Sequence, residues 1–229
     1  MGKNAYNHTM THDNKTFLAI ESAGGSISAC LYKGQVLSAQ YADIPYGHIV
    51  HLIPMIESVV NASGMTKDDI DAIAVSTGPG FFTGLRIGLA TANGLGLALQ
   101  KPVYGVTTLE AFAHQVNARG SVLIIMETKR VDFYVQVFDG VEARKELKIA
   151  TIEDIIPMLE AVDFIAGSGV ERFIKTHPVK DEKILKSFDF PTAESVAKSV
   201  VKALSEGREL TTNPEYHREA ETIVKNKQG

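Results

Sequence analysis

The chain has 229 residues, of which 45% are hydrophobic, and its 23 basic and 27 acidic residues give a net charge of −4. A chain of this length can bury a core without disulfides, and the single Cys30 cannot form one internally. The acidic balance and the absence of a dense basic stripe argue against this chain binding RNA alone, and the longest apolar stretch, 84–99, is too short for a membrane span.

The first 14 residues are polar and lack the apolar core of a secretion signal. We interpret residues 1–16 as a loose extension and expect a soluble, cytoplasmic protein in a reducing compartment. The pairs His8 and His12, and His48 and His51, have spacings that could suit a metal, but no third ligand accompanies either pair. The sequence therefore predicts no metal site.

The first half predicts strands over 17–21, 26–32, 35–41 and 70–76 and a helix over 48–62. Thr66 and Asp69 form a capping pattern just before the fourth of these strands. The helix carries apolar residues at helical spacing that must be buried on one side or another. They are Ile49, Leu52, Ile53, Ile56 and Val60, with Met55 and Val59 expected on the outward side.

The stretch Gly78 to Leu99 has the strongest pattern in the chain. Gly78-Pro79-Gly80 predicts a turn, and Thr83, a favoured N-cap residue, predicts the start of a helix that runs to Leu99. Small residues recur every fourth position along this helix and form one row, flanked by leucines. They are Gly84, Gly88, Ala92 and Gly96, with Leu85, Leu89, Leu95 and Leu99 beside them. Such a row allows close packing, either on the chain's own sheet or on a partner; these two alternatives stay open.

The same stretch fails the specific nucleotide fingerprints. Gly84 is followed by Leu85 and Arg86 instead of the Lys and Ser or Thr of a phosphate-binding P-loop, and Thr83 stands where the dinucleotide fingerprint needs a small residue. After this helix, the pattern predicts a strand over 101–106 and a helix over 109–116 capped by Thr108.

The second half repeats the first at low identity. A shift of 106 positions places Leu18 on Ile124, Glu21 on Glu127 and Leu31 on Val137 without a gap. We therefore expect two lobes of similar build, 17–118 and 119–229, of which the second is reduced. In the second lobe, 163–166 predicts a strand and 195–204 a helix.

GPGFFTGLRIGLATANGLGLAL, residues 78–99, resembles the signature of the TsaB (YeaZ) family, with Phe81 where the family usually has Ser. Pro214, Tyr216 and Arg218 resemble the family's short C-terminal Pro-x-Tyr-x-Arg motif. Together with the repeat, the resemblance implies an α/β fold of the duplicated actin-like ATPase, or ribonuclease-H-like, type with two βββαβα lobes.

In actin-like ATPases an acidic residue and a flexible loop follow the first strand of each lobe and hold phosphates through a metal. The matching positions here are Glu21, with Gly24 and Gly25, and Glu127. Gly167 and Gly169 could form an adenosine-contact turn. The loop after Glu127 contains no glycine, so we expect at most a vestigial nucleotide site and no cofactor.

The resemblance implies a non-catalytic subunit in the threonylcarbamoyladenosine modification of tRNA. Its implied partners are a TsaD-like catalytic subunit and a TsaE-like ATPase, with tRNA reached only through the complex and a homodimer when the chain is alone. The family pairs through its first two long helices, which predicts an interface of Leu52, Met55, Ile56, Val59, Gly84, Leu85, Gly88, Leu89, Ala92 and Gly96. The alternative is an actin-like ATPase or small-molecule kinase; a metallopeptidase ranks last, because no H-E-x-x-H motif is present.

Overall fold

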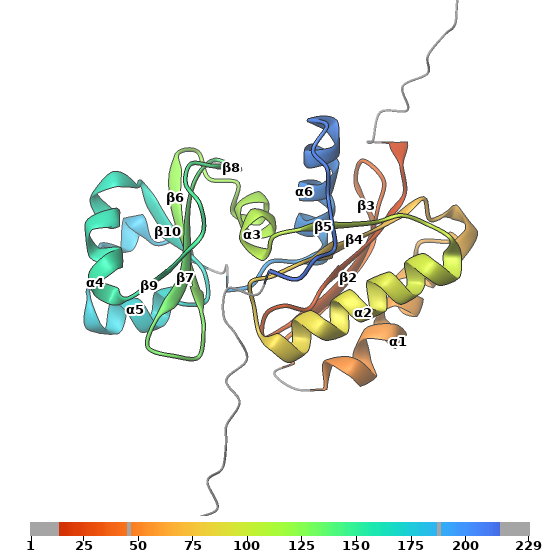
Figure 1. The fold of residues 1–229 in the computed structure, drawn as a ribbon, viewed down its shortest axis with the longest axis horizontal. Helices are drawn as coiled ribbons and strands as arrows, with labels where there is room; N and C mark the ends of the chain where they lie inside the picture. Colours follow the sequence, from red (N-terminus) through yellow and green to blue (C-terminus); the bar gives the residue numbers. More distant parts are fainter. Residues whose placement is uncertain (1–13, 45–46, 187–188, 216–229) are drawn as a thin grey trace, which may run out of the picture.

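The computed structural model describes residues 14–44, 47–186 and 189–215, which form two β-sheets with helices packed on them (Figure 1). The first sheet has the strand order β3-β2-β1-β4-β5. Its strands are β1 (Phe17–Glu21), β2 (Ile27–Tyr32), β3 (Val36–Ala42), β4 (Ala72–Ser76) and β5 (Val103–Val106). Strand β1 pairs antiparallel with β2 and parallel with β4.

The second sheet has the order β10-β6-β7-β8, and β9 also pairs with β7. Its strands are β6 (Ser121–Glu127), β7 (Phe133–Asp139), β8 (Glu142–Ala143), β9 (Lys148–Ala150) and β10 (Phe164–Ala166). The helices, including three short 3-10 turns, are α1 (His48–Ala62), η2 (Lys67–Asp69), α2 (Phe82–Leu99), α3 (Thr108–Val116), α4 (Ile152–Ile155), η3 (Ile156–Ala161), α5 (Val170–Thr176), η4 (Asp181–Lys183) and α6 (Ala193–Ser205).

The predicted repeat is confirmed, because β6 and β7 reproduce β1 and β2. Strand β6 pairs antiparallel with β7 and parallel with β10, as β1 does with β2 and β4. Glu21 pairs with Ser28 in the first lobe, whereas Glu127 pairs with Phe133 in the second, so the second turn is one residue shorter. The expected alignment without a gap is therefore wrong beyond this turn, where Leu31 matches Gln136 instead of Val137. The two acidic residues therefore end equivalent strands.

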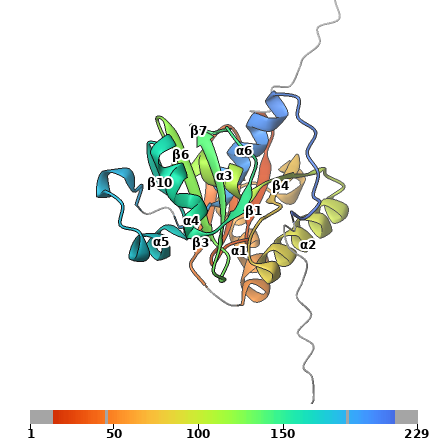
Figure 2. The same cartoon turned by 60° about the vertical axis from the view of Figure 1, so that its left-hand side comes forward.

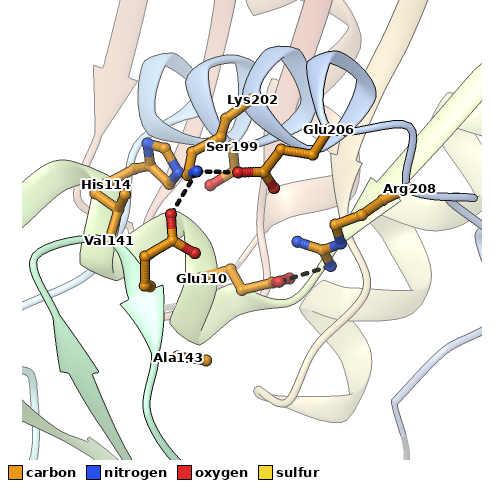
Figure 3. Close-up of a pocket in the computed structure, with 9 residues that line it drawn as sticks. Glu110, His114, Val141, Ala143, Ser199, Lys202, Glu206 and Arg208 are labelled. Atoms are coloured by element: carbon orange, nitrogen blue, oxygen red, sulfur yellow. Dashed lines mark hydrogen bonds and ion pairs between the residues drawn. The ribbon is translucent and has the colours of Figure 1, made fainter.

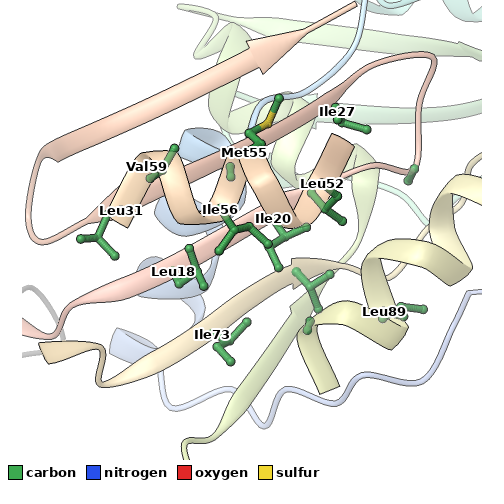
Figure 4. Packing of buried hydrophobic residues seen from close by; sticks show 14 of the residues in the cluster. Leu18, Ile20, Ile27, Leu31, Leu52, Met55, Ile56, Val59, Ile73 and Leu89 are labelled. Carbon is green, nitrogen blue, oxygen red and sulfur yellow. The ribbon is translucent and has the colours of Figure 1, made fainter. Parts of the chain in front are cut away.

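Helices α1 and α2 lie side by side on one face of the first sheet, as Figures 1 and 2 both show. Their apolar sides pack with the sheet into one buried cluster (Figure 4). The sheet contributes Leu18, Ile20, Leu31 and Ile73, among others, and the helices contribute Leu52, Met55, Ile56, Val59, Leu85, Leu89 and Ala92. Burial of this apolar surface holds the two helices against the sheet.

Helix α6 packs on the opposite face of the first sheet, although it follows the second lobe in the chain. Val196 and Val200 of α6 join Phe17 and Ala19 of β1 in a second buried cluster. The backbone N–H of Ala193 donates to Ser28 Oγ at 2.8 Å, which fixes the start of α6 on β2. The segment 119–229 thus supplies a helix to the first lobe.

Helix α3 joins the two lobes. Its Ala111 belongs to the cluster beneath α6, whereas Leu109, Phe112 and Ala113 pack on the second sheet. Figure 1 shows α3 between α6 and the second sheet.

Two of the predicted helix caps are wrong by one or two positions. Phe81, not Thr83, is the N-cap of α2, because the Phe81 N–H donates to Ala23 O at 2.7 Å and fixes the chain there. Thr107, not Thr108, caps α3, because a capping box needs an acid three residues after the cap and Glu110 satisfies this only for Thr107. The cap formed by Thr66 and Asp69 is confirmed.

Candidate functional site

The glycine row of α2 faces the chain's own sheet. A Cβ on Gly84 would collide with Ser22 O, one on Gly88 with Ser22 Oγ, and one on Gly96 with the Val103 side chain. The Ser22 hydroxyl also donates to Gly84 O at 2.9 Å. Of the two alternatives that the sequence left open, the structure selects internal packing for this row.

The apolar neighbours of the row are internal as well. Every residue predicted for the partner interface is buried in the described monomer: Leu52, Met55, Ile56, Val59, Gly84, Leu85, Gly88, Leu89, Ala92 and Gly96. The side of each helix that carries these residues meets the first sheet. These ten residues therefore do not form a free surface of the monomer.

The outward sides of α1 and α2 carry a different apolar set. Ile49 is 69% exposed and Ile53 43% exposed on α1, and Leu97 is 83% exposed on α2. Val50 of α1 and Phe82 at the start of α2 are exposed as well, and nothing lies within 4 Å of a Cβ placed on Gly94. Ile49 and Ile53 lie at one edge of the apolar stripe that also contains Leu52 and Ile56, so the sequence signal for this surface is a stripe wider than the part that the sheet covers.

Glu21 lies at the end of β1 and is fully buried. Its Oε1 accepts a hydrogen bond from the Ala23 N–H at 2.6 Å, and its Oε2 has no hydrogen-bond partner. Burial disfavours the charged carboxylate and raises the pKa of Glu21 to about 7, against the opposing effect of the Ser76 hydroxyl and nearby backbone N–H groups. Gly24 and Gly25, in the turn that follows, lie under the ring of Phe190.

Glu127, at the matching position of the second lobe, is bound by an arginine. Arg172 Nε lies 2.7 Å from Glu127 Oε2 and Arg172 Nη2 lies 2.9 Å from Oε1, while the Lys129 N–H donates to Oε1 at 2.8 Å. The Arg172 guanidinium also stacks on the Phe133 ring, 3.7 Å from its centroid. A carboxylate in such a bidentate pair is already neutralised.

Gly167 and Gly169 pack closely on strand β6. A Cβ on Gly167 would collide with Ile125 O, and one on Gly169 would lie 2.7 Å from the Phe133 ring. The Gly169 N–H donates to Ile125 O at 2.9 Å. The structure thus gives both glycines a packing reason, and it places Gly169 and Glu127 around the same Phe133 and Arg172 pair.

The histidines with metal-like spacing do not converge. His48 is buried, with Nε2 2.9 Å from Ile44 O, whereas His51 is exposed on the same helix. His8 and His12 lie outside the described residues. Within the ranges that the structure describes, no three His, Cys, Asp or Glu side chains gather as a metal site.

A polar cavity of about 320 Å³ lies where α3, α6 and β8 meet (Figure 3). Lys202 of α6 forms an ion pair with Glu142 of β8 at 2.5 Å and another with Glu206. Arg208 lies 2.7 Å from Glu110. Figure 3 shows Lys202 and Arg208 in ion pairs with carboxylates. We therefore interpret this cavity as a polar junction between the lobes.

A family model described as "TsaD: tRNA N6-adenosine threonylcarbamoyltransferase" matches residues 45–206. Two relatives are named "tRNA threonylcarbamoyladenosine biosynthesis protein TsaB". The one from Buchnera aphidicola subsp. Schizaphis graminum is 26% identical and covers 78% of this chain and 90% of its own length. The one from Escherichia coli (strain K12) is 29% identical, with 66% and 71% covered. The chain belongs to the TsaD-like family, in its TsaB (YeaZ) group.

Solved structures of this group have the same fold. "YeaZ from Pseudomonas aeruginosa" is 25% identical with a TM-score of 0.75, covering 88% of this chain and 99% of that one. A second Pseudomonas aeruginosa protein, described as having similarity to peptidase YEAZ, is 27% identical with a TM-score of 0.77, covering 89% and 100%. The expected duplicated actin-like α/β fold is confirmed.

In this TsaB-group chain, the stretch 78–99 that resembles the family signature forms the turn after β4 and the helix α2 that follows it. Phe81, which departs from the usual Ser, ends that turn and contacts both Phe190 and Lys129. No helix in the described part of the chain has the length and apolar character to cross a bilayer.

Proposed function

We propose that this chain is a supporting subunit in the biosynthesis of threonylcarbamoyladenosine in tRNA, without an active site of its own. The TsaB names of its relatives support the pathway. The state of the two lobe acids supports the lack of catalysis, because Glu21 is buried beside a turn covered by Phe190 and Glu127 is neutralised by Arg172. The same observation disfavours the alternative of an ATPase or small-molecule kinase, which would need both acids free for metal and phosphate.

The proposed partner is a TsaD-like catalytic subunit, bound through the outward sides of α1 and α2. The observation that carries this proposal is the exposure of Ile49, Ile53 and Leu97 on two adjacent helices of the first lobe. An apolar surface of this kind is typical of a protein interface. The proposed interface is therefore this outward set of residues, in place of the inward set that was predicted from the sequence.

A second copy of the chain can use the same surface when the catalytic subunit is absent, so the proposal includes a homodimer of the isolated protein. A TsaE-like ATPase joins the assembly, and tRNA contacts the chain only through the complex, in keeping with the net charge of −4. This proposal places the protein in the cytoplasm.

The test measures binding of the TsaD-like subunit from the same cell by titration calorimetry. Ile53→Glu and Leu97→Glu each place a charge on the outward surface, and we expect each to weaken binding at least about tenfold, because a buried unpaired charge is costly. The matched control is Val131→Glu, at a site 82% exposed in the second lobe, which should bind like wild type.

Far-ultraviolet circular dichroism and the unfolding midpoint check that each variant is folded. Reconstituted modification of tRNA should fall in the order of the measured affinities, and ATP hydrolysis by the chain alone should be absent. Wild-type affinity in both outward variants would contradict the proposed surface, and Glu21-dependent hydrolysis by the isolated chain would favour the ATPase alternative.

A further inference from the structure

The turn between β1 and β2, residues 22–26, is covered by a phenylalanine from a distant part of the chain. A Cβ on Gly24 would collide with the Phe190 ring, and one on Gly25 would lie 2.9 Å from its Cζ. The ring therefore rests directly on the backbone of both glycines. No side chain larger than hydrogen fits at Gly24 while Phe190 stays in place.

Phe190 is held from several sides. Gln115 Nε2 of α3 donates to Phe190 O at 2.9 Å, and the Phe81 ring meets the Phe190 ring edge-on with centroids 6.4 Å apart. The ammonium group of Lys129, from the second lobe, lies 3.9 Å from the centroid of Phe81. The position of Phe190 thus depends on both lobes and on the helix between them.

Polar atoms without hydrogen-bond partners lie at the two ends of the turn that this ring covers. Glu21 Oε2 and Ser26 Oγ are both buried and make no hydrogen bond, although Glu21 and Ser26 are each only 1% exposed. Burying a polar atom without a partner is unfavourable, and the cost is much larger for an ionised carboxylate than for a neutral carboxyl group. The covered turn is therefore suited to a protonated Glu21.

We propose that the seated Phe190 ring and an ionised Glu21 exclude one another, so that the two form a pH-sensitive switch in the first lobe. With the ring seated, the turn is dry and Glu21 is neutral. When Glu21 ionises, water must reach Oε2, and the ring leaves Gly24 and Gly25. The two events are thermodynamically linked, so each must change the other by the same factor.

The surroundings of Glu21 place this switch near neutral pH. Desolvation raises its pKa to about 7, and the hydrogen bonds from Ser76 and from backbone N–H groups only partly oppose this effect. The titratable groups that neighbouring elements bring toward the turn are His48 of α1, beside Gly84, and Lys129 of the loop 128–132. Glu194 and Lys198 of α6 influence the pKa of Cys30 on the neighbouring strand β2.

The first test follows the carboxyl signal of Glu21 by NMR in the full chain carrying ¹³C-labelled glutamate, with Glu21→Gln to assign the signal. In wild type we expect a midpoint near neutral pH. In Phe190→Ala the midpoint should fall by about one pH unit or more, a tenfold change in proton affinity. Tyr41→Ala, which removes a half-exposed ring on β3, is the matched control and should keep the wild-type midpoint.

The reciprocal test follows the ring signals of Phe190. In wild type they should change with the same midpoint as Glu21, and in Glu21→Gln they should stay constant between about pH 5.5 and 8, because the residue can no longer ionise. An unchanged Glu21 midpoint in Phe190→Ala, or ring signals that titrate in Glu21→Gln as in wild type, would overturn the switch.

If Phe190→Ala does not fold, Gln115→Ala decides instead. It removes only the hydrogen bond to Phe190 O, so it should speed amide hydrogen exchange at Ala23, Gly24 and Gly25 relative to strand β4. Exchange equal to wild type at those three amides, together with an unchanged Glu21 midpoint, would count against the proposal.

Discussion

Glu21 is buried and His114 partly buried, and in both residues burial favours the uncharged form. Burial raises the pKa of Glu21 to about 7 from 4.5 and lowers that of His114 to about 4 from 6.5. The folded state keeps the Glu21 proton longer than the unfolded state does, so stability falls as the pH rises from about 4.5 to 7. For His114 the unfolded state binds the proton first, so stability falls as the pH drops from about 6.5 to 4.

His114→Gln should therefore reduce the loss of stability on acidification. The neutral amide cannot take up a proton in the unfolded state, which removes the linkage that wild type shows between pH 6.5 and 4. Urea unfolding at pH 7 and at pH 5 measures the difference in the free energy of unfolding. The Glu21 contribution is the same in both proteins, so on going from pH 7 to pH 5 the free energy of unfolding should change less favourably in wild type than in His114→Gln.

His51→Gln is the matched control, because His51 is exposed on α1 while His114 is partly buried at the lobe junction. It should show the wild-type dependence on pH. Equal losses in wild type and His114→Gln would mean that His114 is solvated in the folded protein.

At the level of the element, helix α2 has glycines on both of its sides with opposite roles. A Cβ on Gly88 collides with Ser22 Oγ, which itself donates to Gly84 O, whereas a Cβ on Gly94 meets nothing within 4 Å. Gly88 is thus required for close approach of the helix to the sheet. Gly94 lies on the exposed side and only weakens the helix.

Gly88→Ala should destabilise the protein by about 1–3 kcal/mol, because overpacking moves either Ser22 or the helix. Gly94→Ala should stabilise it by up to about 1 kcal/mol, since alanine is the better helix former in an interior position. Thermal and urea unfolding of the two single variants measure both effects, and each serves as the control for the other. A neutral Gly88→Ala would show that α2 does not approach the sheet as closely as described.

The residue pattern predicted where α1 and α2 lie in the chain, but not which part of the protein each side of these helices contacts. The interval of four between Gly84, Gly88, Ala92 and Gly96 requires a close neighbour without naming it, because a helix with small residues on one side packs equally well on a sheet or on another chain. The same applies to α1, where Leu52 and Ile56 are buried while Ile49 and Ile53, at the edge of the same apolar stripe, stay exposed. Hydrophobic periodicity fixes which residues share a side; it does not fix which side meets the core.

On the scale of the whole molecule, the lobes are joined by α3 and by α6, which returns from the second lobe to the first sheet. Lys202 of α6 and Glu142 of β8 form an ion pair across this junction at 2.5 Å. The Glu142 side chain is 66% exposed and Lys202 also contacts Glu206, so solvent and a competing partner weaken this pair.

A double-mutant cycle with Lys202→Ala and Glu142→Ala should therefore give a coupling energy of about 1 kcal/mol or less, decreasing at high salt. Urea unfolding of wild type, both single variants and the double variant at low and high salt measures it. Lys198 and Glu194, an exposed pair within α6, provide a comparison cycle that does not span the lobes. A coupling several times larger, unaffected by salt, would show that this pair fixes the lobes together.

The sequence by itself determined the duplicated order of strands and helices, the placement of Glu21 and Glu127 at matching strand ends, and the resemblance to the TsaB family. These features depend on neighbours in the chain and on a repeat of 106 positions, which are visible in the residue pattern. Only the tertiary structure decided that the glycine row is internal, that Phe190 covers the turn after Glu21, and that Arg172 neutralises Glu127. Those contacts join residues far apart in the chain, and they are set by how the packed layers bring side chains together, which no local pattern specifies.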